Sequence, residues 1–344
     1  MRNLQRLARP EQFAKTGYLL KNSFTIIGRD WDIVRPWIRS TIYGIIAATP
    51  MFIAIAIIVN SIILEDGSGI GLAVLLILVW MWLAISKHFF FNKQEIRQSW
   101  LVAETVRGKD RSYREAKDAS KELKKQIRWL AILDIAVARF ASRGGSGQSE
   151  GGGLGSGLAN LIASGLTEVW DLLNHYLIPA VTIDGVSIKD GVGTVKELKD
   201  RVPQTLMGVF GIDFIGSVVR SIMAPVYLVL IVISLAIGVL AAGSLASFVI
   251  PIDAQLPQWL LTGGSLQFAP FPLILLIFIG RLFSIVVNRA VTAVKVLYFT
   301  IFYMQITHSD EIAEDLQPEL EAFLKMDEEA EFNKATEKKK ASGE

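Results

Sequence analysis

Long apolar runs separated by short polar stretches dominate the pattern of hydrophobic positions along the chain. Two such runs lie within residues 41–91, one on each side of an acidic and glycine-containing turn at 65–69. The hydrocarbon core of a bilayer is ~30 Å thick and takes about 20 apolar helical residues. Residues 41–91 are therefore predicted to form a transmembrane helical hairpin.

Two weaker apolar segments occupy residues 127–183 and are joined by a glycine-rich connector at 144–157. The first segment is short for a span and contains Asp134 and Arg139. Two layouts fit this pattern. Either both segments cross the membrane, which gives six spans, or they form a re-entrant or interfacial hairpin, which leaves four. The apolar pattern alone leaves both layouts open.

Residues 214–308 contain the last two predicted spans. In the first of them, small residues recur every four positions, a spacing that lets helices approach closely. These residues are Gly238, Ala242 and Ala246. The connection between the two spans, 251–267, contains no Lys or Arg, which is typical of a loop outside the cytoplasm.

The last span carries polar residues at membrane depth. They fall within about 80° on a helical wheel and so form one stripe. The stripe consists of Arg281, Ser284, Asn288, Thr292 and Lys295. If the helix begins near Pro272, Arg281 lies close to mid-membrane. Ionisable side chains within spans usually face a bundle interior, a partner charge or water, so this stripe is the first functional candidate. For Lys295 and Arg289 the alternative is snorkelling to the headgroups.

A second polar face is predicted on the amphipathic helix 158–177, where Glu168, Asp171 and His175 share one side. Such a helix can line water within a bundle, lie flat at the interface, or pack its acids against the basic stripe. A metal site formed by these three side chains is a weak alternative, because they lie on one helix face without a second histidine. No metal and no cofactor is predicted.

The distribution of charge orients the chain. Residues 1–40 are basic and amphipathic and are predicted to lie on the membrane surface. Residues 92–128, a predicted charged helical loop, hold eleven Lys and Arg against six acids, and residues 184–213 contain four more Lys and Arg. Because cytoplasmic loops are enriched in Lys and Arg, these loops and both termini are predicted to be cytoplasmic.

The tail 309–344 is acidic, with ten acids between positions 310 and 331, and is predicted to be a partly disordered helix. Its charge complements that of residues 92–128, on which we expect it to rest. Contact of 92–128 with anionic lipids is the alternative, although the interspersed acids argue against a dedicated polybasic patch.

The composition is typical of a polytopic membrane protein, since 51% of the 344 residues are hydrophobic and the mean hydropathy is +0.42. The net charge of +2 comes from basic residues beside the spans, so nucleic acid is not predicted as a partner. The sequence has no cysteine, which excludes disulfides and thiolate chemistry. It also has no hydrolase elbow, zinc-protease helix or nucleotide-binding loop, so no enzyme is predicted.

Several short motifs occur in a fixed order along the first two thirds of the chain. They are His88-Phe89-Phe90-Phe91-Asn92, Ile127-Arg128-Trp129, and Trp170 followed by Leu177-Ile178-Pro179-Ala180-Val181. This order resembles a family of uncharacterised prokaryotic six-span integral membrane proteins. The resemblance implies an all-α fold with six transmembrane helices in a prokaryotic plasma membrane, and it implies no activity. The glycine-rich connector, Asp134 and Arg139 depart from the family pattern.

Two functions from different classes fit these features. The polar faces at membrane depth favour an oligomeric channel or transporter-like pore for small ions or solutes, selective for anions if the basic stripe faces the lumen. If Arg281 instead pairs with Glu168 or Asp171, the charges form a structural lock or a switch. The alternative is a non-catalytic membrane scaffold or assembly subunit that packs through Gly238 and the small residues after it. Either function predicts the lipid bilayer and a homo-oligomer or membrane-protein partner as the surroundings of the chain.

Overall fold

The computed structural model describes residues 26–63, 67–145, 170, 173–197, 202–240, 250–251 and 267–317. Over these residues the chain is helical, apart from turns and one antiparallel pair of two-residue strands, β1 (Ile250–Pro251) and β2 (Gln267–Phe268). Short 3-10 helices occur at Trp31–Val34, Gly67–Gly69 and Ser309–Glu311. The prediction of an all-α fold is therefore confirmed.

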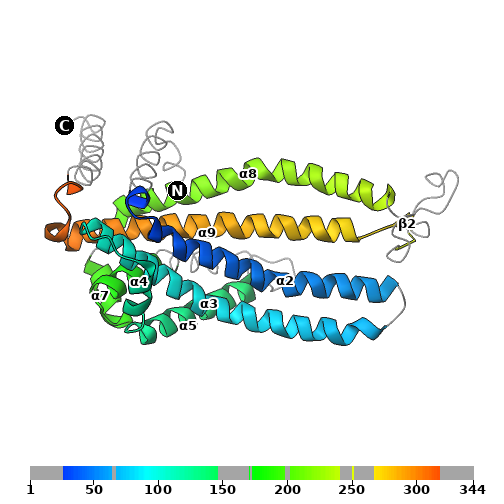
Figure 1. The fold of residues 1–344 in the computed structure, drawn as a ribbon, viewed down its shortest axis with the longest axis horizontal. Coiled ribbons are helices and arrows are strands. Elements are labelled where there is room, and N and C mark those ends of the chain that lie inside the picture. The colour runs from blue at the N-terminus through cyan, green and yellow to red at the C-terminus, as the bar shows by residue number, and fades with distance from the viewer. Residues whose placement is uncertain are drawn as a thin grey trace, which may run out of the picture. The chain divides into compact units, whose positions relative to one another are not determined.

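Four helices are long and apolar enough to cross a membrane. They are α2 (Arg35–Ile63), α3 (Ile70–Val106), α8 (Val202–Leu240) and α9 (Phe271–Thr307). All four coincide with the strongest apolar runs of the sequence (Figure 1). Proline occurs inside α2 at Pro50 and inside α8 at Pro225, as membrane helices tolerate.

The third predicted span differs from these four. It lies in α5 (Lys124–Gly145), whose 22 residues include six ionisable side chains, and α5 is not among the helices apolar enough to cross. Charges at that density are costly in hydrocarbon. The six-span layout is therefore not confirmed. The fourth predicted segment and the connector 144–157 lie largely outside the described residues.

Two predicted loops are shorter in the structure than the sequence pattern indicates. Helix α3 continues to Val106, so residues 92–106 prolong the helix of the predicted hairpin. Helix α7 (Ile188–Glu197) and the first part of α8 occupy the predicted loop 184–213. An apolar run measures only the length of helix that hydrocarbon can surround, and polar residues at helical spacing continue the same helix beyond it.

A capped helix follows α3. Helix α4 (Tyr113–Ala119) begins with a capping box, in which the Glu115 carboxylate accepts from the Ser112 backbone N–H at 2.8 Å and the Ser112 hydroxyl accepts from the Glu115 N–H at 3.4 Å. The chain reverses ahead of this cap at Gly108, whose φ of 74° suits a residue without a Cβ. This turn and cap fix where α4 starts.

The chain divides into two compact units. Unit 1 comprises Met1–Ile38, Phe91–Asp213 and Val291–Glu344, and unit 2 comprises Arg39–Phe90 and Phe214–Ala290. Helices α3 and α9 each contribute residues to both units. The two units bury different kinds of side chain.

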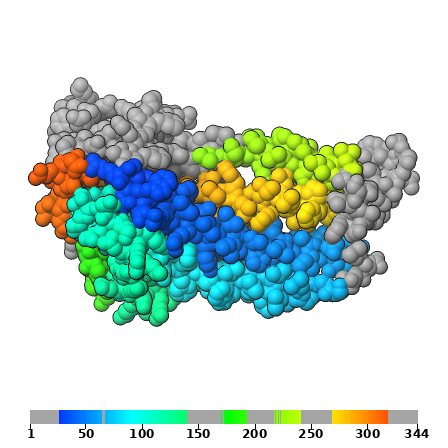
Figure 2. Space-filling view, viewed as in Figure 1, coloured from blue at the N-terminus to red at the C-terminus, as the bar shows by residue number. Residues whose placement is uncertain are grey.

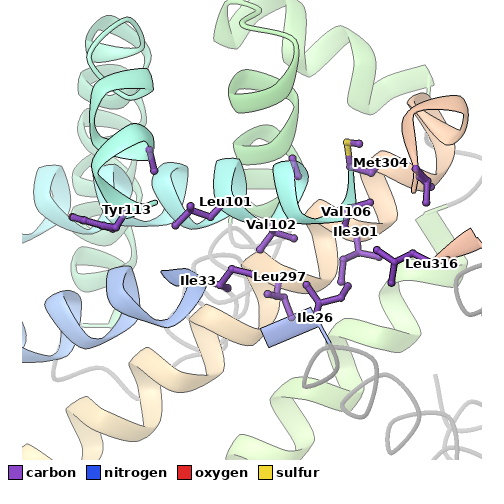
Figure 3. Packing of buried hydrophobic residues seen from close by; sticks show 13 residues of the cluster. Ile26, Ile33, Leu101, Val102, Val106, Tyr113, Leu297, Ile301, Met304 and Leu316 are labelled. Carbon is purple, nitrogen blue, oxygen red and sulfur yellow. The ribbon is translucent and has the colours of Figure 1, made fainter. Parts of the chain in front are cut away.

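Unit 1 has a core of large apolar side chains. Leu101 and Val102 of α3 meet Leu297 and Ile301 of α9, with Ile33 packed beside them (Figure 3). A Leu or Phe side chain moved fully out of water contributes about 1.5–3 kcal/mol, so this cluster stabilises unit 1 as the core of a water-soluble domain would.

Unit 2 has the opposite arrangement. The side chains it buries are small, and among its described apolar residues they include Ala47, Ala54 and Ala73. Its large apolar side chains point outward, and Ile62 and Leu228 are 70% and 63% exposed. Helices α2 and α3 lie side by side as adjoining bands (Figures 1 and 2). An apolar surface of this extent is an aggregation hazard in water but suits a lipid environment.

Glycines allow close approaches to α8 and α9 within unit 2. A Cβ on Gly280 of α9 would lie 2.6 Å from Cζ of Tyr227 of α8 and would overlap the tyrosine ring. A Cβ on Gly238 of α8 would lie 2.8 Å from the Ala269 carbonyl oxygen and would also meet the Phe268 ring. The Ala269 N–H donates to the Gly238 carbonyl at 2.9 Å. Gly238 thus permits a close approach, whereas Ala242 and Ala246 lie outside the described residues.

We predict that Gly238→Ala lowers the stability of the detergent-solubilised protein, because the added methyl group displaces Phe268 and the Ala269 carbonyl. Overpacking of this kind costs about 1–3 kcal/mol. The matched control is Gly71→Ala on α3, where a Cβ would have no atom within 4 Å. Thermal unfolding followed by circular dichroism checks this prediction, and equal melting temperatures for both variants would contradict it.

Candidate functional site

The predicted polar stripe occupies one side of α9, but its members lie in different surroundings. Arg281 and Asn288 are exposed, and the Asn288 amide donates to the half-buried Ser284 hydroxyl at 3.4 Å. Thr292 is half-buried. Lys295 is only 6% exposed and begins a buried run, 295–305, in unit 1. The outward-facing part of the stripe is therefore the part that belongs to unit 2.

Lys87, a basic residue of α3 in unit 2, interacts electrostatically with Arg281 of the stripe. Lys87 also interacts with Arg289 of α9, and all three charges are positive. The described parts of unit 2 contain no Asp or Glu in their sequence. Among the described residues Arg281 makes no ion pair. Lys87, Arg281 and Arg289 form what we call the cationic cluster.

Helix geometry gives the depth of each charge. At 1.5 Å per residue, Arg281 lies about 15 Å along α9 from Phe271, and Arg289 lies about 27 Å along it. Lys87 lies about 26 Å along α3 from Ile70. Measured against an apolar layer of ~30 Å, Arg281 is near the middle, as the sequence predicts, and the other two charges are near one edge.

Contacts between α2 and α3 hold the Lys87 region in place. The Tyr43 hydroxyl and the Ser86 hydroxyl share a hydrogen bond of 2.6 Å, and the Tyr43 ring stacks on Phe90 at 4.4 Å. These contacts bracket Lys87 on both sides along α3. The sequence analysis did not single out Lys87, although it and His88 are the ionisable residues in an otherwise apolar run, 70–91.

The predicted acidic face is described only at its last residues. Glu168 and Asp171 lie outside the described residues. His175 is 4% exposed in unit 1, and its ring lies 5.5 Å from that of Phe299. Residues 174–182 are buried throughout, so this end of the helix presents no solvated face. The part of the chain that the structure describes contains no group of His, Asp and Glu able to hold a metal ion.

A hydrogen-bonded network in unit 1 joins the end of α9 to two other segments. Asp184 accepts from the Tyr303 hydroxyl, and its other oxygen lies 2.7 Å from His308 Nε2. The second ring nitrogen of His308 lies 2.9 Å from Glu311, which accepts from Arg107 at 2.6 Å. The pair formed by Arg107 and Glu311 confirms the expected contact between the acidic tail and residues 92–128.

The charge state of His308 depends on this network. Partial burial opposes protonation, but the hydrogen bonds to Asp184 and Glu311 outweigh it and raise the pKa of His308 above its ordinary value of 6.5. A doubly hydrogen-bonded imidazolium satisfies both carboxylates. No pattern in the sequence connects His308 with Asp184, because 124 positions separate them.

Two positions that carry the family resemblance meet in unit 1. The Asn92 amide donates to one Asp134 oxygen at 2.5 Å, and the Trp170 indole N–H donates to the other at 2.7 Å. Asp134, which departs from the family pattern, is thus hydrogen-bonded to two residues of the motifs. Its role is to join α3, α5 and the segment at Trp170.

The fold and the cationic cluster define the class as an all-helical membrane protein with four candidate spans. Comparisons of the chain with protein-family models, with characterised proteins and with solved structures give no match. The resemblance to a six-span prokaryotic family therefore stays a prediction.

We predict that the stability of the protein falls as the pH rises through the raised pKa of His308. A group whose pKa is higher in the folded state contributes its stabilisation below the ordinary pKa and loses it above the folded value. Melting temperatures measured between about pH 6 and pH 9 in detergent should therefore decrease in the wild type.

His308→Asn should flatten this dependence, whereas His88→Asn, on α3 of unit 2, should keep it. A His308→Asn protein with an unchanged pH profile would show that a different group is responsible.

Proposed function

We propose that the chain forms an oligomeric channel or transporter-like pore for small anions, with the cationic cluster lining the path. The observation that supports this most is the position of Arg281, which is exposed near mid-membrane depth without an ion pair among the described residues. An arginine at the centre of a span costs about 2.5–3.5 kcal/mol even on insertion scales. Contact with water in a pore removes that cost.

The surroundings of Arg281 favour an oligomer. Ile277, one turn before Arg281 on the same side of α9, is 42% exposed, and Asn288 on that side is also exposed, so within unit 2 this side of α9 is open. The described residues of one chain do not enclose a water path there. A second copy, or a membrane partner, placed against α9 would shield Arg281 and Asn288 from lipid while leaving them wet.

The sign of the cluster favours anions. Lys87 and Arg289 would meet an ion at the edge of the apolar layer, and Arg281 would meet it about 12 Å deeper. Rings of basic side chains favour anions in pores, and Arg281 pairs with no acid among the described residues. We place the protein in a prokaryotic plasma membrane with both termini in the cytoplasm, on the basis of the loop charges and the resemblance.

A membrane scaffold or assembly subunit is the second candidate. Unit 1 favours it, because a packed core with a hydrogen-bonded surface network offers a rigid body for a partner to bind. In that case the exposed side of α9 would be covered by a partner helix, and Arg281 would be paired there. Neither function is enzymatic.

We predict chloride flux through the purified protein in liposomes, and a five- to tenfold slower flux for Arg281→Gln. That loss corresponds to about 1 kcal/mol, the value of one charge interaction at a wet site. The control is Lys189→Gln, which removes one exposed positive charge from α7. Potassium flux should remain low in all three proteins.

Equal chloride flux through Arg281→Gln and the wild type would remove the cluster from the path. Absence of flux from a folded, oligomeric wild type would favour the scaffold.

A further inference from the structure

Unit 1 contains a buried arginine that makes no ion pair among the described residues. Arg97 of α3 is 4% exposed. Its guanidinium donates to the Ser120 hydroxyl at 3.0 Å and to the Tyr113 hydroxyl at 2.7 Å, and it lies 5.5 Å from the centre of the Tyr113 ring. The Tyr113 hydroxyl donates onward to Gln94 at 2.9 Å. All these partners are neutral, so among the described residues the guanidinium is hydrogen-bonded without an opposite charge beside it.

Further positive charges lie around Arg97. Lys93, one turn earlier on α3, interacts electrostatically with Arg97, with Lys117 of α4 and with Lys124 of α5. The three lysines are exposed. The Arg97 hydrogen bond to Ser120, whose hydroxyl also donates to the Lys117 carbonyl at 2.9 Å, brings this turn of α3 beside the chain between Lys117 and Lys124. Each of the four cations makes the presence of the others less favourable.

The nearby acids are engaged elsewhere. Glu104 pairs with Arg107, Lys109 and Arg111 at 2.7 to 3.6 Å. Asp118, which also acts electrostatically on Lys117, is bound to Lys121 at 2.7 Å. Among the described residues, no ion pair reaches Lys93, Arg97, Lys117 or Lys124. The interspersed acids, which in the sequence argue against a basic patch, thus form no ion pair with these four residues in the part of the chain that the structure describes.

The start of α5 adds to the positive potential. Its first turn contains Lys124 and Lys125 and no acid. A helix N-terminus carries a partial positive charge that acidic side chains usually offset, so two lysines there are the reverse of the favourable arrangement. An anion bound beside this turn would offset both the lysines and the helix dipole.

We propose that Lys93, Arg97, Lys117 and Lys124, which we call the Arg97 site, bind a phosphate group. A phosphate group has several strong acceptor oxygens. Several lysine and arginine side chains can therefore donate hydrogen bonds to the same phosphate group. The proposal rests on unit 1 alone and is independent of the pore function.

The position along α3 favours a phospholipid headgroup over a soluble phosphate. Lys93 follows Phe91, the last residue of the apolar run, and Arg97 is about 6 Å further along the helix. Headgroup phosphates occupy this level, just beyond the hydrocarbon. Trp129, in the second turn of α5, is 53% exposed, as tryptophans at membrane interfaces are.

The test measures binding of fluorescent phosphatidylglycerol and phosphatidylcholine to the full chain in detergent micelles, by anisotropy. We expect tighter binding of phosphatidylglycerol by the wild type. Lys117→Gln and Lys124→Gln should each weaken it about fivefold, the effect expected for one lysine near an anionic headgroup. Lys189→Gln, which removes an exposed charge from α7, should change it less than twofold.

Inorganic phosphate distinguishes the two sources of the ligand. Displacement of phosphatidylglycerol by phosphate at millimolar concentration would assign the site to free phosphate as well as to lipid. No displacement would assign it to the lipid headgroup alone.

Two results would overturn the proposal. One is equal affinity for the two lipids together with no phosphate binding. The other is an equal loss of phosphatidylglycerol binding in Lys124→Gln and Lys189→Gln, which would show that only the overall charge matters. Arg97→Gln should cause the largest loss, and because it could also unfold unit 1, the two exposed lysine variants decide the matter.

Discussion

Helices α3 and α9 reverse their packing along their length, and both units depend on that reversal. In unit 2 these helices keep their large apolar side chains on the outside and bring small residues and glycine backbone together. In unit 1 the same two helices bury large side chains such as Leu101 and Phe299. One half of each helix suits hydrocarbon as its solvent and the other half suits water. The same helix therefore buries small side chains in unit 2 and large apolar side chains in unit 1.

Electrostatics follows the same division. In unit 1, acids and bases are neighbours, and Glu104, Glu311 and Asp184 each bind more than one partner. In the described parts of unit 2, every ionised side chain is basic. A positive charge in a region without carboxylates has to be balanced by water, by a mobile anion or by another chain. For both the cationic cluster and the Arg97 site, the question is what balances the positive charge. The cluster lies along the apolar stretches of α3 and α9, and the Arg97 site lies just beyond the apolar stretch of α3.

The sequence predicted much of the fold, because hydrocarbon selects on hydropathy alone. The four candidate spans coincide with the strongest apolar runs, whereas the two further spans of the six-span layout are not confirmed, and the membrane depth of Arg281 stays a prediction. The extension of α3 to Val106 was not predicted, since polar residues at helical spacing look like a loop between spans. Lys87 was missed because only the fold shows that it acts on α9, and the burial of Lys295 was missed because a helical wheel does not show which neighbour covers it. That Arg97 makes no ion pair among the described residues was not predicted for a similar reason, since charge counts over 92–128 do not reveal which acid pairs with which base.

The chain that leaves α9 is held at several points before it continues to residue 318. Glu311 is held by Arg107, the Ala313 N–H donates to the Val106 carbonyl at 3.0 Å, and Asp315 binds Arg29 at 2.5 Å. The tail therefore starts from a fixed anchor on unit 1. A binding group joined to this anchor through a short linker would meet unit 1 at an effective concentration on the order of millimolar. This effective concentration does not depend on how much of the protein the membrane contains.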